Sequence, residues 1–391
     1  MNRLHSIRWC LAAIALVATC LTAQAGEPAS QPATTASAPA APAAARGPQA
    51  WSLPKGMIVE AASLAVTADG RYATFGQVVA TPDAAEDRRP AQVVCWLSES
   101  ATGKMTQLTD LLAKEPDAKD LVVRQVTLSP TKDLACMIAV ASDSSLHAFV
   151  VDLSSLKVQK IATAPLVLAA WAGENLLITE YSREKGLSPI RLFKPFSGQS
   201  VALPIRAACI AATMDGKVLI VGGNPKTLTS ANGKESMDQA GKLLAINPDG
   251  KVLAELASLE SLNSGVVVSP NGKFAAFQHR GSGKSPASPG AGRDGISIRV
   301  VPLAGGEGWT ISKSGVPLRV LDAGQVLAVV TGSDSAGETL KLYDSDGNAL
   351  PFPSALAGTI VNGRVYSIAP GDQPVIKSSP LKADKSAGSG K

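Results

Sequence analysis

Short apolar runs recur along the chain from about residue 57 to residue 376, and tight polar turns separate them. The runs are rich in Val, Ile, Leu and Ala, and several alternate apolar with polar positions, as at 296–301 and 339–343. A period of two predicts half-buried β-strands rather than helices. The chain is therefore expected to fold mainly from short strands joined by hairpins.

The turns come in two series that repeat in step. The first series carries Gly or Asn where a tight hairpin needs a positive φ angle, and it lies at 68–71, 130–133, 172–175, 214–217, 270–273, 323–325 and 362–364. The second series follows each first turn, at 102–104, 154–157, 197–199, 248–251, 304–306 and 346–348, with a degenerate member near 369–372. Each repeat thus holds two hairpins, which is four short antiparallel strands.

Seven repeats of four strands each predict an all-β chain that forms a single β-propeller of seven four-stranded blades. A closed ring protects strand edges, because each blade covers its neighbour. The last repeat lacks a clear fourth strand, and the apolar segment 56–60 precedes the first repeat, so we expect 56–60 to close the ring. A pair of β-sandwiches is the alternative, although the regular hairpins lack Greek-key spacing.

Part of the repeat is similar to a known one. The sequence VSPNGKFAAF at 268–277 resembles the SPDGKxIAF phrase of TolB-like, WD40-like (PD40) propeller repeats. FVVDL at 149–153 resembles their third strand, and VTADGRYATF at 66–75 is a weaker copy of the first phrase. The Gly-His and Trp-Asp pairs of true WD40 repeats are absent. The resemblance implies a propeller fold and carries no activity with it.

The N-terminus reads as an export signal. A basic segment at 1–8 precedes an apolar run at 9–22, and the small-x-small triplet at 23–25 predicts cleavage after Ala25. A lipoprotein modified at Cys20 is the alternative. We expect a signal peptide at 1–25, an Ala/Pro-rich disordered linker at 26–50, the propeller at 51–376 and a disordered polar tail at 377–391. The protein would then be periplasmic or secreted, with no transmembrane segment.

Composition limits the kinds of partner and site that the chain can have. The chain has 391 residues, 45% of them hydrophobic, which excludes disorder of the whole chain, and a net charge of +5 is too small to indicate nucleic-acid binding. Only His147 and His279 follow the signal, so no metal site or cofactor is expected. Cys95, Cys136 and Cys209 lie in apolar runs and are expected to be buried thiols, with a Cys95–Cys136 bridge left open.

Three motif matches lack the context that their chemistry needs. GAGRDG at 290–295 fits a dinucleotide pattern, but a strand rather than a helix follows it. GSGKS at 281–285 resembles the end of a phosphate-binding loop, but proline follows. DSDGN at 344–348 resembles a calcium loop with its glycine misplaced, and a β-turn is the expected structure.

The candidate binding residues lie on the longest insertions, at 80–92, 109–122, 222–241 and 279–295. Three of these join the second and third strands of a blade and one joins two blades, so all four should project from one face of the ring. Because loops on a rigid scaffold commonly carry function, we expect binding through this loop-rich face. Its basic candidates are Arg88, Arg89, Lys226, Arg280, Lys284 and Arg293.

The inner strands give the candidates for the central channel. They are mostly Ala, Val, Leu, Ile and Thr, and their strong polar groups are Arg124, Arg206 and Arg319. None of these strands holds a carboxylate or histidine for acid–base work, so no catalytic residue is predicted. The expected function is an exported non-catalytic module that binds a protein or an envelope component. A lactonase-like hydrolase using loop carboxylates such as Asp322 or Glu338, or a small-ligand or glycan sensor, remains the alternative.

Overall fold

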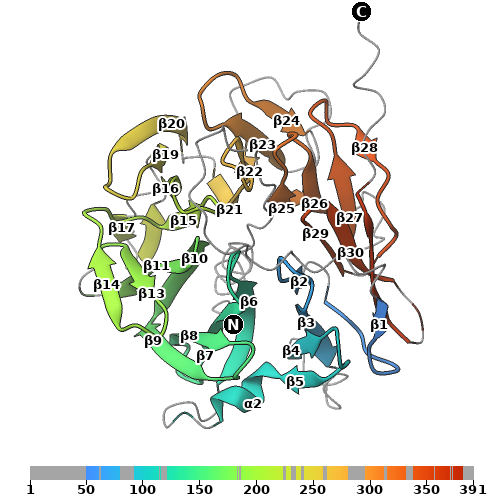
Figure 1. The fold of residues 1–391 in the computed structure, drawn as a ribbon. Coiled ribbons are helices and arrows are strands. Elements are labelled where there is room, and N and C mark those ends of the chain that lie inside the picture. Colours follow the sequence, from blue (N-terminus) through green and yellow to red (C-terminus); the bar gives the residue numbers. More distant parts are fainter. Residues whose placement is uncertain are drawn as a thin grey trace, which may run out of the picture.

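The chain is an all-β propeller of seven blades, and each blade is a four-stranded antiparallel sheet (Figure 1). This computed structural model describes residues 50–60, 63–79, 92–113, 115, 121–182, 184, 186–222, 226–229, 235–238, 242–258, 262–280, 296–311, 315–331, 338–355, 357–369, 371 and 373–381. The blades follow one another round the ring in sequence order, so their neighbours in space are also neighbours in the chain.

Within a blade, the strands run outward from the axis in chain order. Blade 1 contains β2 (Ala65–Val66), β3 (Tyr72–Val79), β4 (Gln92–Glu99) and β5 (Met105–Gln107). Blade 2 contains β6 (Val122–Leu128), β7 (Leu134–Val140), β8 (Leu146–Asp152) and β9 (Val158–Ala164). Blade 3 contains β10 (Leu166–Ala172), β11 (Asn175–Ser182), β13 (Arg191–Lys194) and β14 (Gln199–Ala202), and the short β12 (Gly186–Leu187) pairs with β11.

The other four blades repeat this order. Blade 4 contains β15 (Cys209–Ala212), β16 (Leu219–Gly222), β19 (Lys242–Ile246) and β20 (Val252–Ser258), with the hairpin β17 (Lys226–Thr229) and β18 (Glu235–Asp238) between its second and third strands. Blade 5 contains β21 (Leu262–Val268), β22 (Phe274–Arg280), β23 (Ile296–Pro302) and β24 (Trp309–Ile311). Blade 6 contains β25 (Gly315–Val320), β26 (Val326–Thr331), β27 (Glu338–Tyr343) and β28 (Ala349–Leu350). Blade 7 contains β29 (Ala357–Val361), β30 (Arg364–Ala369), β31 (Val375–Pro380) and β1 (Ala50–Ser52).

An N-terminal strand does complete the last blade, but it is β1 and not the predicted segment 56–60. Trp51 lies opposite Ile376 on β31, and the Leu53 amide donates to the Pro374 carbonyl at 2.8 Å. Trp51 and Leu53 are buried in the core between blades 7 and 1. They give this segment a larger apolar anchor than Ile58, which is 61% exposed.

Segment 56–60 instead extends the inner edge of blade 1. Val59 forms a bridge with Gln77 on β3, and the Glu60 amide donates to the Gly76 carbonyl at 2.8 Å. The end of blade 7 also differs from the prediction. The turn near 369–372 joins β30 to β31, and β31 runs to Pro380, beyond the predicted start of the tail at 377. Blade 7 therefore takes three strands from the C-terminal end of the chain, and its fourth strand, β1, comes from the N-terminal end.

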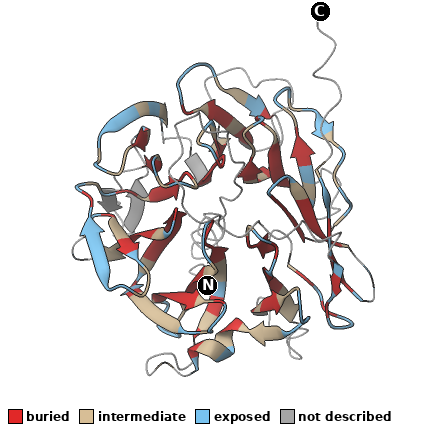
Figure 2. Ribbon diagram, viewed as in Figure 1, coloured by how far each residue is buried: buried red, intermediate tan, exposed pale blue. Residues whose placement is uncertain are grey.

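The core is divided among the gaps between blades. Among the described residues, buried apolar side chains form seven clusters, and each cluster joins neighbouring blades. Figure 2 shows buried residues concentrated in the inner and middle strands of the blades, whereas the outer strands β14 and β20 are largely exposed. Val, Ile, Leu and Ala fill these gaps because a blade that packs on both faces needs apolar residues on both sides of its strands. In the described part of the chain, no helix is long and apolar enough to cross a membrane.

Candidate functional site

The two faces of the ring are built differently, and the first-series turns define one of them, here called the turn face. In blade 1, the buried Thr67 hydroxyl donates to Asp69 at 2.8 Å and accepts from the Tyr72 amide at 3.0 Å. Thr213 donates to Asp215 in the same way in blade 4, at 2.8 Å. A buried serine takes this position in two other blades, as Ser129 and Ser269. Each turn is therefore fixed by its own side chains as well as by glycine.

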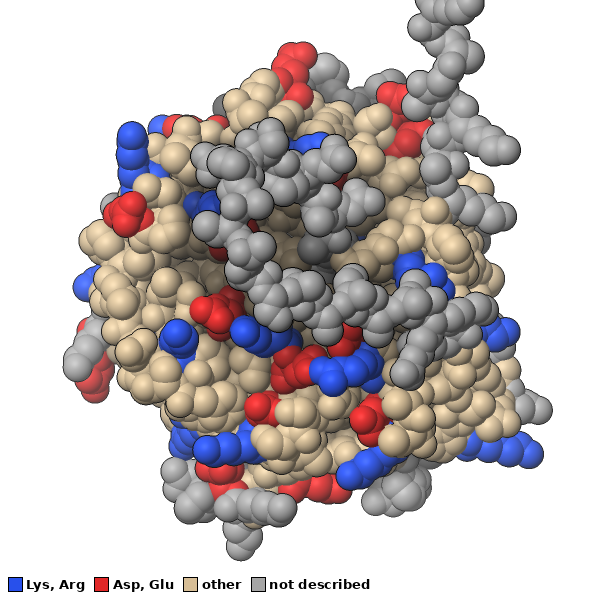
Figure 3. Space-filling model, in the orientation of Figure 1, with Lys and Arg blue, Asp and Glu red and all other residues tan. Residues whose placement is uncertain are grey.

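Charged pairs join the turns of the first three blades. Arg71 forms an ion pair with Asp69 of its own turn at 2.5 Å and a second one with Asp133 of blade 2. Lys132 of blade 2 lies 3.8 Å from Glu174 of blade 3. Figure 3 shows acidic and basic side chains interspersed on the visible face, outside the grey atoms, rather than gathered into an area of one sign. Such pairs are exposed, so each contributes little stability alone.

Backbone and amide contacts continue the ring of joined turns. A Cβ atom at Gly216 would lie 3.0 Å from the Ala172 carbonyl group, so blades 3 and 4 touch through their backbones. The remaining turn-to-turn hydrogen bonds are Met214 N to Pro270 O, Asn271 N to Asp322 Oδ1 and Asn362 Nδ2 to Ala68 O. Among the described turns, only those of blades 6 and 7 lack a direct link, and there Arg319 joins the inner strands instead.

Electrostatics favours the ionised form of the turn carboxylates. Burial raises the pKa of Asp69, but hydrogen bonds from the Arg71 amide and the Thr67 hydroxyl, together with the Arg71 charge, outweigh it, and the pKa lies below 3.8. Asp215 follows the same pattern: burial raises its pKa, but the Lys217 amide, the Thr213 hydroxyl and the Lys217 charge outweigh this effect and lower the pKa. These aspartates therefore hold their turns as anions at neutral pH.

The opposite face, here called the loop face, carries the long insertions, as the strand boundaries require. The connections β3–β4, β16–β19 and β22–β23 join second to third strands, and β5–β6 joins blades 1 and 2. Arg88, Arg89, Lys284 and Arg293 lie outside the described residues. Lys226 and Arg280 lie on strands β17 and β22, and their side chains are outside the described part.

One insertion is partly a packed element. Segment 109–122 is predicted as a loop, but α2 (Leu108–Leu112) overlaps its start and buries Leu108 and Leu112 in the core between blades 1 and 2. Apolar residues four apart lie on one face of a helix, which is why these two leucines are buried together. This part of the loop face therefore belongs to the packed core rather than to a free loop.

The three channel candidates lie at the inner edge of the ring, and among the described residues no hydrogen bond or ion pair joins any two of them. Arg124 is exposed at an irregular point of the β6–β7 pairing, and Arg206 is exposed just before β15. Arg319 is only 4% exposed, and its Nε and Nη2 atoms donate to the Thr359 hydroxyl at 3.2 and 3.0 Å. Arg319 thus joins the inner strands of blades 6 and 7, where the apolar cluster of described residues is the smallest.

Among the described residues, Ser145 and His147 form the pair that most resembles a nucleophile and its catalytic base. The His147 Nε2 atom lies 3.1 Å from the Ser145 hydroxyl, and its Nδ1 atom lies 3.5 Å from the Thr163 hydroxyl. The ring stacks beside Phe149 and is 8% exposed. The nearby Asp143 carboxylate interacts with the Ser145 hydroxyl and, through its charge, with His147. Burial of the His147 ring sets this group of side chains apart from an open catalytic site.

The three cysteine thiols are inert because they are buried. Cys95, Cys136 and Cys209 are free and buried, so the open possibility of a Cys95–Cys136 bridge is not realised. Burial raises the pKa of each of the three thiols to about 12, which leaves almost no thiolate at neutral pH. Across the described residues, no group of three or more His, Cys, Asp or Glu side chains could hold a metal ion. The segment 344–348 forms the expected turn, in which Asp344 accepts from the amides of Asp346 and Asn348.

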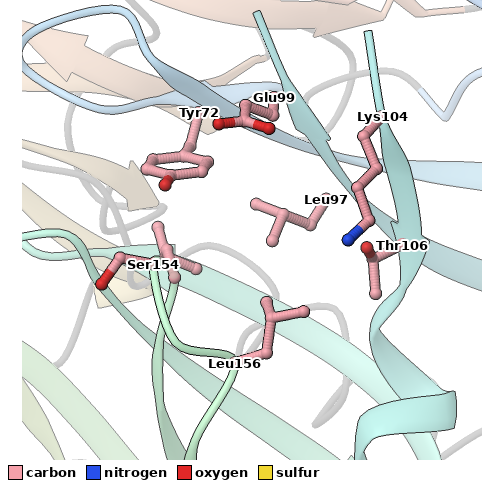
Figure 4. A pocket seen from close by; sticks show the side chains of 8 residues that line it. Tyr72, Leu97, Glu99, Lys104, Thr106, Ser154 and Leu156 are labelled. Atoms are coloured by element: carbon pink, nitrogen blue, oxygen red, sulfur yellow. The ribbon is translucent and has the colours of Figure 1, made fainter. Parts of the chain in front are cut away.

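A cleft of about 80 Å³ opens on the turn side, between blades 1 and 2 (Figure 4). Its residues come from the end of the first turn of blade 1 and from the second-series turns and strands of both blades, and they are Tyr72, Leu97, Glu99, Lys104, Thr106, Leu153, Ser154 and Leu156. Lys104, Ser154 and Leu156 belong to second-series turns, but no site was expected there, because two blades must pack together before the cleft exists.

Comparison with known proteins supports the fold. No protein-family model matches the sequence, and no curated protein matches it either. The β-propeller domain of the Trilobed protease from Pyrococcus furiosus, which has an open velcro topology, is 11% identical with a TM-score of 0.53, over 84% of this chain and 99% of that one. A chain of the Mitotic Checkpoint Complex is 12% identical with a TM-score of 0.49, over 90% and 100% of the two chains.

TolB from Acinetobacter baumannii is 15% identical with a TM-score of 0.36, over 63% of this chain and 55% of TolB. Of these three structures, only the Trilobed protease domain exceeds a TM-score of 0.5, and at such identity it shows a shared fold rather than a shared activity. The chain is therefore a seven-bladed β-propeller. In this chain, β1 pairs with the last blade.

Proposed function

We propose that this protein is a non-catalytic docking module that works in the periplasm or as a secreted protein, and that it binds a protein or an envelope component through its loop face. The observation that carries the proposal is the contrast between the two faces. Short turns tied to one another form the turn face, whereas the long insertions leave from the other end of the same blades. A rigid scaffold that presents long loops is the usual plan of a binding surface.

The insertions carry charges of both signs. Their basic residues include Arg88, Arg89, Lys226, Arg280, Lys284 and Arg293, and acidic residues such as Asp83, Glu86, Asp87 and Glu235 lie among them. Mixed charges of this kind set the register and orientation of a complementary partner rather than selecting a partner of one sign.

The N-terminal sequence supports the proposed location. The basic, apolar and small-x-small parts at 1–25 have the order of a secretory signal, and the Ala/Pro-rich segment 26–50 follows directly. The ring begins with β1 at Ala50, so this segment would hold the closed ring away from whatever anchors its far end. Fractionation and N-terminal sequencing test this, and a mature chain that starts at Gly26 is the expected result.

The docking test compares two variants with the wild type. The protein is cross-linked in its native cells and purified, and bound proteins are identified by mass spectrometry. In one variant, a short Gly-containing turn replaces 281–295. In the control, Lys132→Gln changes a charge on the turn face. We expect a partner that the wild type and the control retain and the loop variant loses.

Two results would count against the proposal. A partner retained by the loop variant would place docking elsewhere on the ring. If no specific partner is captured, the hydrolase and the small-ligand or glycan sensor become the better interpretations. Substrate and glycan screens would then follow, with the purified protein used in both.

A further inference from the structure

The cleft between blades 1 and 2 combines an apolar floor with a polar rim. Leu97 and Leu153 are buried, with 4% and 2% of their surfaces exposed, and Leu156 completes the floor. Figure 4 shows Leu97 and Leu156 in the middle of the cleft, with the side chains of Tyr72, Glu99, Lys104 and Thr106 around them. A volume of about 80 Å³ is enough for one aliphatic side chain and for little more.

The rim is divided into satisfied and unsatisfied polar groups. The Glu99 carboxylate accepts from the Thr102 hydroxyl at 2.7 Å, and the Ser154 hydroxyl donates to Asp152 at 2.6 Å. By contrast, the Lys104 ammonium group and the Thr106 hydroxyl have no ion pair or side-chain hydrogen bond within the described part of the chain. Lys104 and Thr106 are two residues apart at strand β5 (Met105–Gln107), and Figure 4 shows both side chains at the same edge of the cleft.

We propose that this cleft binds the C-terminal residue of a partner chain when that residue is aliphatic. An ammonium group and a hydroxyl at the same edge are suited to a carboxylate, which accepts from both. The adjoining leucines are suited to an aliphatic side chain, which gains free energy by leaving water. A chain terminus carries a carboxylate and a side chain on the same carbon, so a single residue can contact both the rim and the floor.

The rest of the rim adds a preference for the preceding residue. Glu99 lies on a different part of the rim from the Lys104 ammonium group, and the two form no ion pair. Its negative charge favours a basic side chain in the penultimate position, and it disfavours a second acid there. The preferred ligand is therefore a chain that ends in a basic residue followed by Leu, Ile, Val or Met. This site lies on the turn side, so it is independent of docking through the loop face.

Short peptides test the proposal directly. Fluorescence anisotropy measures binding of a labelled peptide ending in Lys-Leu with a free carboxylate to the whole protein. Two probes serve as comparisons: the same peptide with a C-terminal amide, and one ending in Lys-Ala. We expect each comparison peptide to bind about tenfold more weakly, because each lacks one of the two interactions.

Variants locate the site without disturbing the core. Lys104→Gln and the near-isosteric Thr106→Val should weaken binding of the carboxylate peptide and leave binding of the amide unchanged. Lys132→Gln on the same face is the matched control, because Lys132 contacts Glu174 and not the cleft, and it should bind like the wild type. Leucine methyl NMR should show shifts at Leu97 and Leu156 that saturate at about tenfold lower concentration of the carboxylate peptide than of the amide.

Several outcomes would overturn the proposal. Equal affinity for the carboxylate and the amide would show that no terminus is recognised. An unchanged affinity in Lys104→Gln, or methyl shifts confined to other leucines, would place the peptide elsewhere. Absence of binding up to about 5 mM peptide would show that the cleft holds no such ligand. None of these outcomes bears on the loop-replacement variant, so the two proposals fail separately.

Discussion

The turn face and the loop face use the same strands but stabilise the ring differently. On the turn face, hydrogen bonds, ion pairs and close backbone contacts run from blade to blade, from Asn362 and Ala68 through Arg71 and Asp133 to Asn271 and Asp322. On the loop face, the connections are longer, and their described part contributes to the core through α2. One face therefore holds the blades in register, whereas the other presents the long connections.

The largest expected effect comes from opening the ring that both faces share. Trp51→Ala removes the buried side chain by which β1 packs between blades 7 and 1. Truncation of a buried aromatic side chain typically destabilises by about 3–5 kcal/mol, and we expect that loss in the free energy of unfolding measured with urea. Ile58→Ala, in the segment that the sequence favoured as the closing strand, is the control and should change stability by less than about 1 kcal/mol. Equal losses in the two variants would contradict closure by β1.

A smaller effect tests whether the turns hold the blades together. Gly216 and Gly103 both have a positive φ, +70° and +68°, but a Cβ atom at Gly216 would lie 3.0 Å from the Ala172 carbonyl group, whereas Gly103 has nothing within 4 Å. Alanine at either position carries the left-handed penalty of about 1–2 kcal/mol. Gly216→Ala should lose a further 1–3 kcal/mol or so, because blades 3 and 4 must separate. Thermal unfolding of both variants measures the difference, and equal melting temperatures would show that this contact is dispensable.

Much of the fold could be predicted because its signals are local. The Asp-Gly and Asn-Gly turns at 69–70 and 271–272 mark hairpins within a few residues, and every first-series turn joins the expected strands. The closing strand was missed because Trp51 pairs with Ile376, and nothing near either residue indicates a partner so distant in sequence. Two segments had suitable patterns, and only the packing of blade 7 against blade 1 decides between them.

The site was harder to predict for a related reason. The position of Arg319 on an inner strand could be predicted, but its hydrogen bonds to Thr359 depend on how blade 6 meets blade 7. The cross-blade pair of Arg71 with Asp133 is equally non-local. One local signal was available and not used: a Thr or Ser two residues before the Asp or Asn of a first-series turn, as at Thr67, Thr213 and Ser269. That hydroxyl marks the face on which turns are fixed.

Acid should weaken the turn face before the loop face. The folded-state pKa values of Asp69 and Asp215 lie below 3.8, so their contribution to stability is present above about pH 3.8 and is lost as the pH falls through the lower folded values. The double variant Asp69→Asn, Asp215→Asn should be less stable at pH 7 and should lose less stability than the wild type between about pH 4 and pH 2. Urea unfolding at a series of pH values measures this.

The matched control for the acid experiment is Asp143 beside the loop face. The Ser145 hydroxyl and amide lower the pKa of Asp143, but its carboxylate is fully exposed. Asp143→Asn should leave the pH profile close to that of the wild type, because exposed groups are well solvated in both states. If Asp143→Asn flattened the profile as much as the double variant, acid sensitivity would not belong to the turn face.

The smallest effect concerns the ion pairs that join the first blades. Arg71→Gln removes the contacts with Asp69 and Asp133 across two turns, and exposed pairs of this kind contribute about 0–1 kcal/mol. The loss should shrink further as NaCl rises from about 0.05 to 1 M, because salt screens exposed charges. Lys104→Gln, which removes a charge that forms no ion pair, should change stability less than Arg71→Gln at low salt. If the Arg71 effect does not depend on salt, the contribution of this side chain is its packing over the Tyr72 ring, 5.4 Å away, rather than its charge.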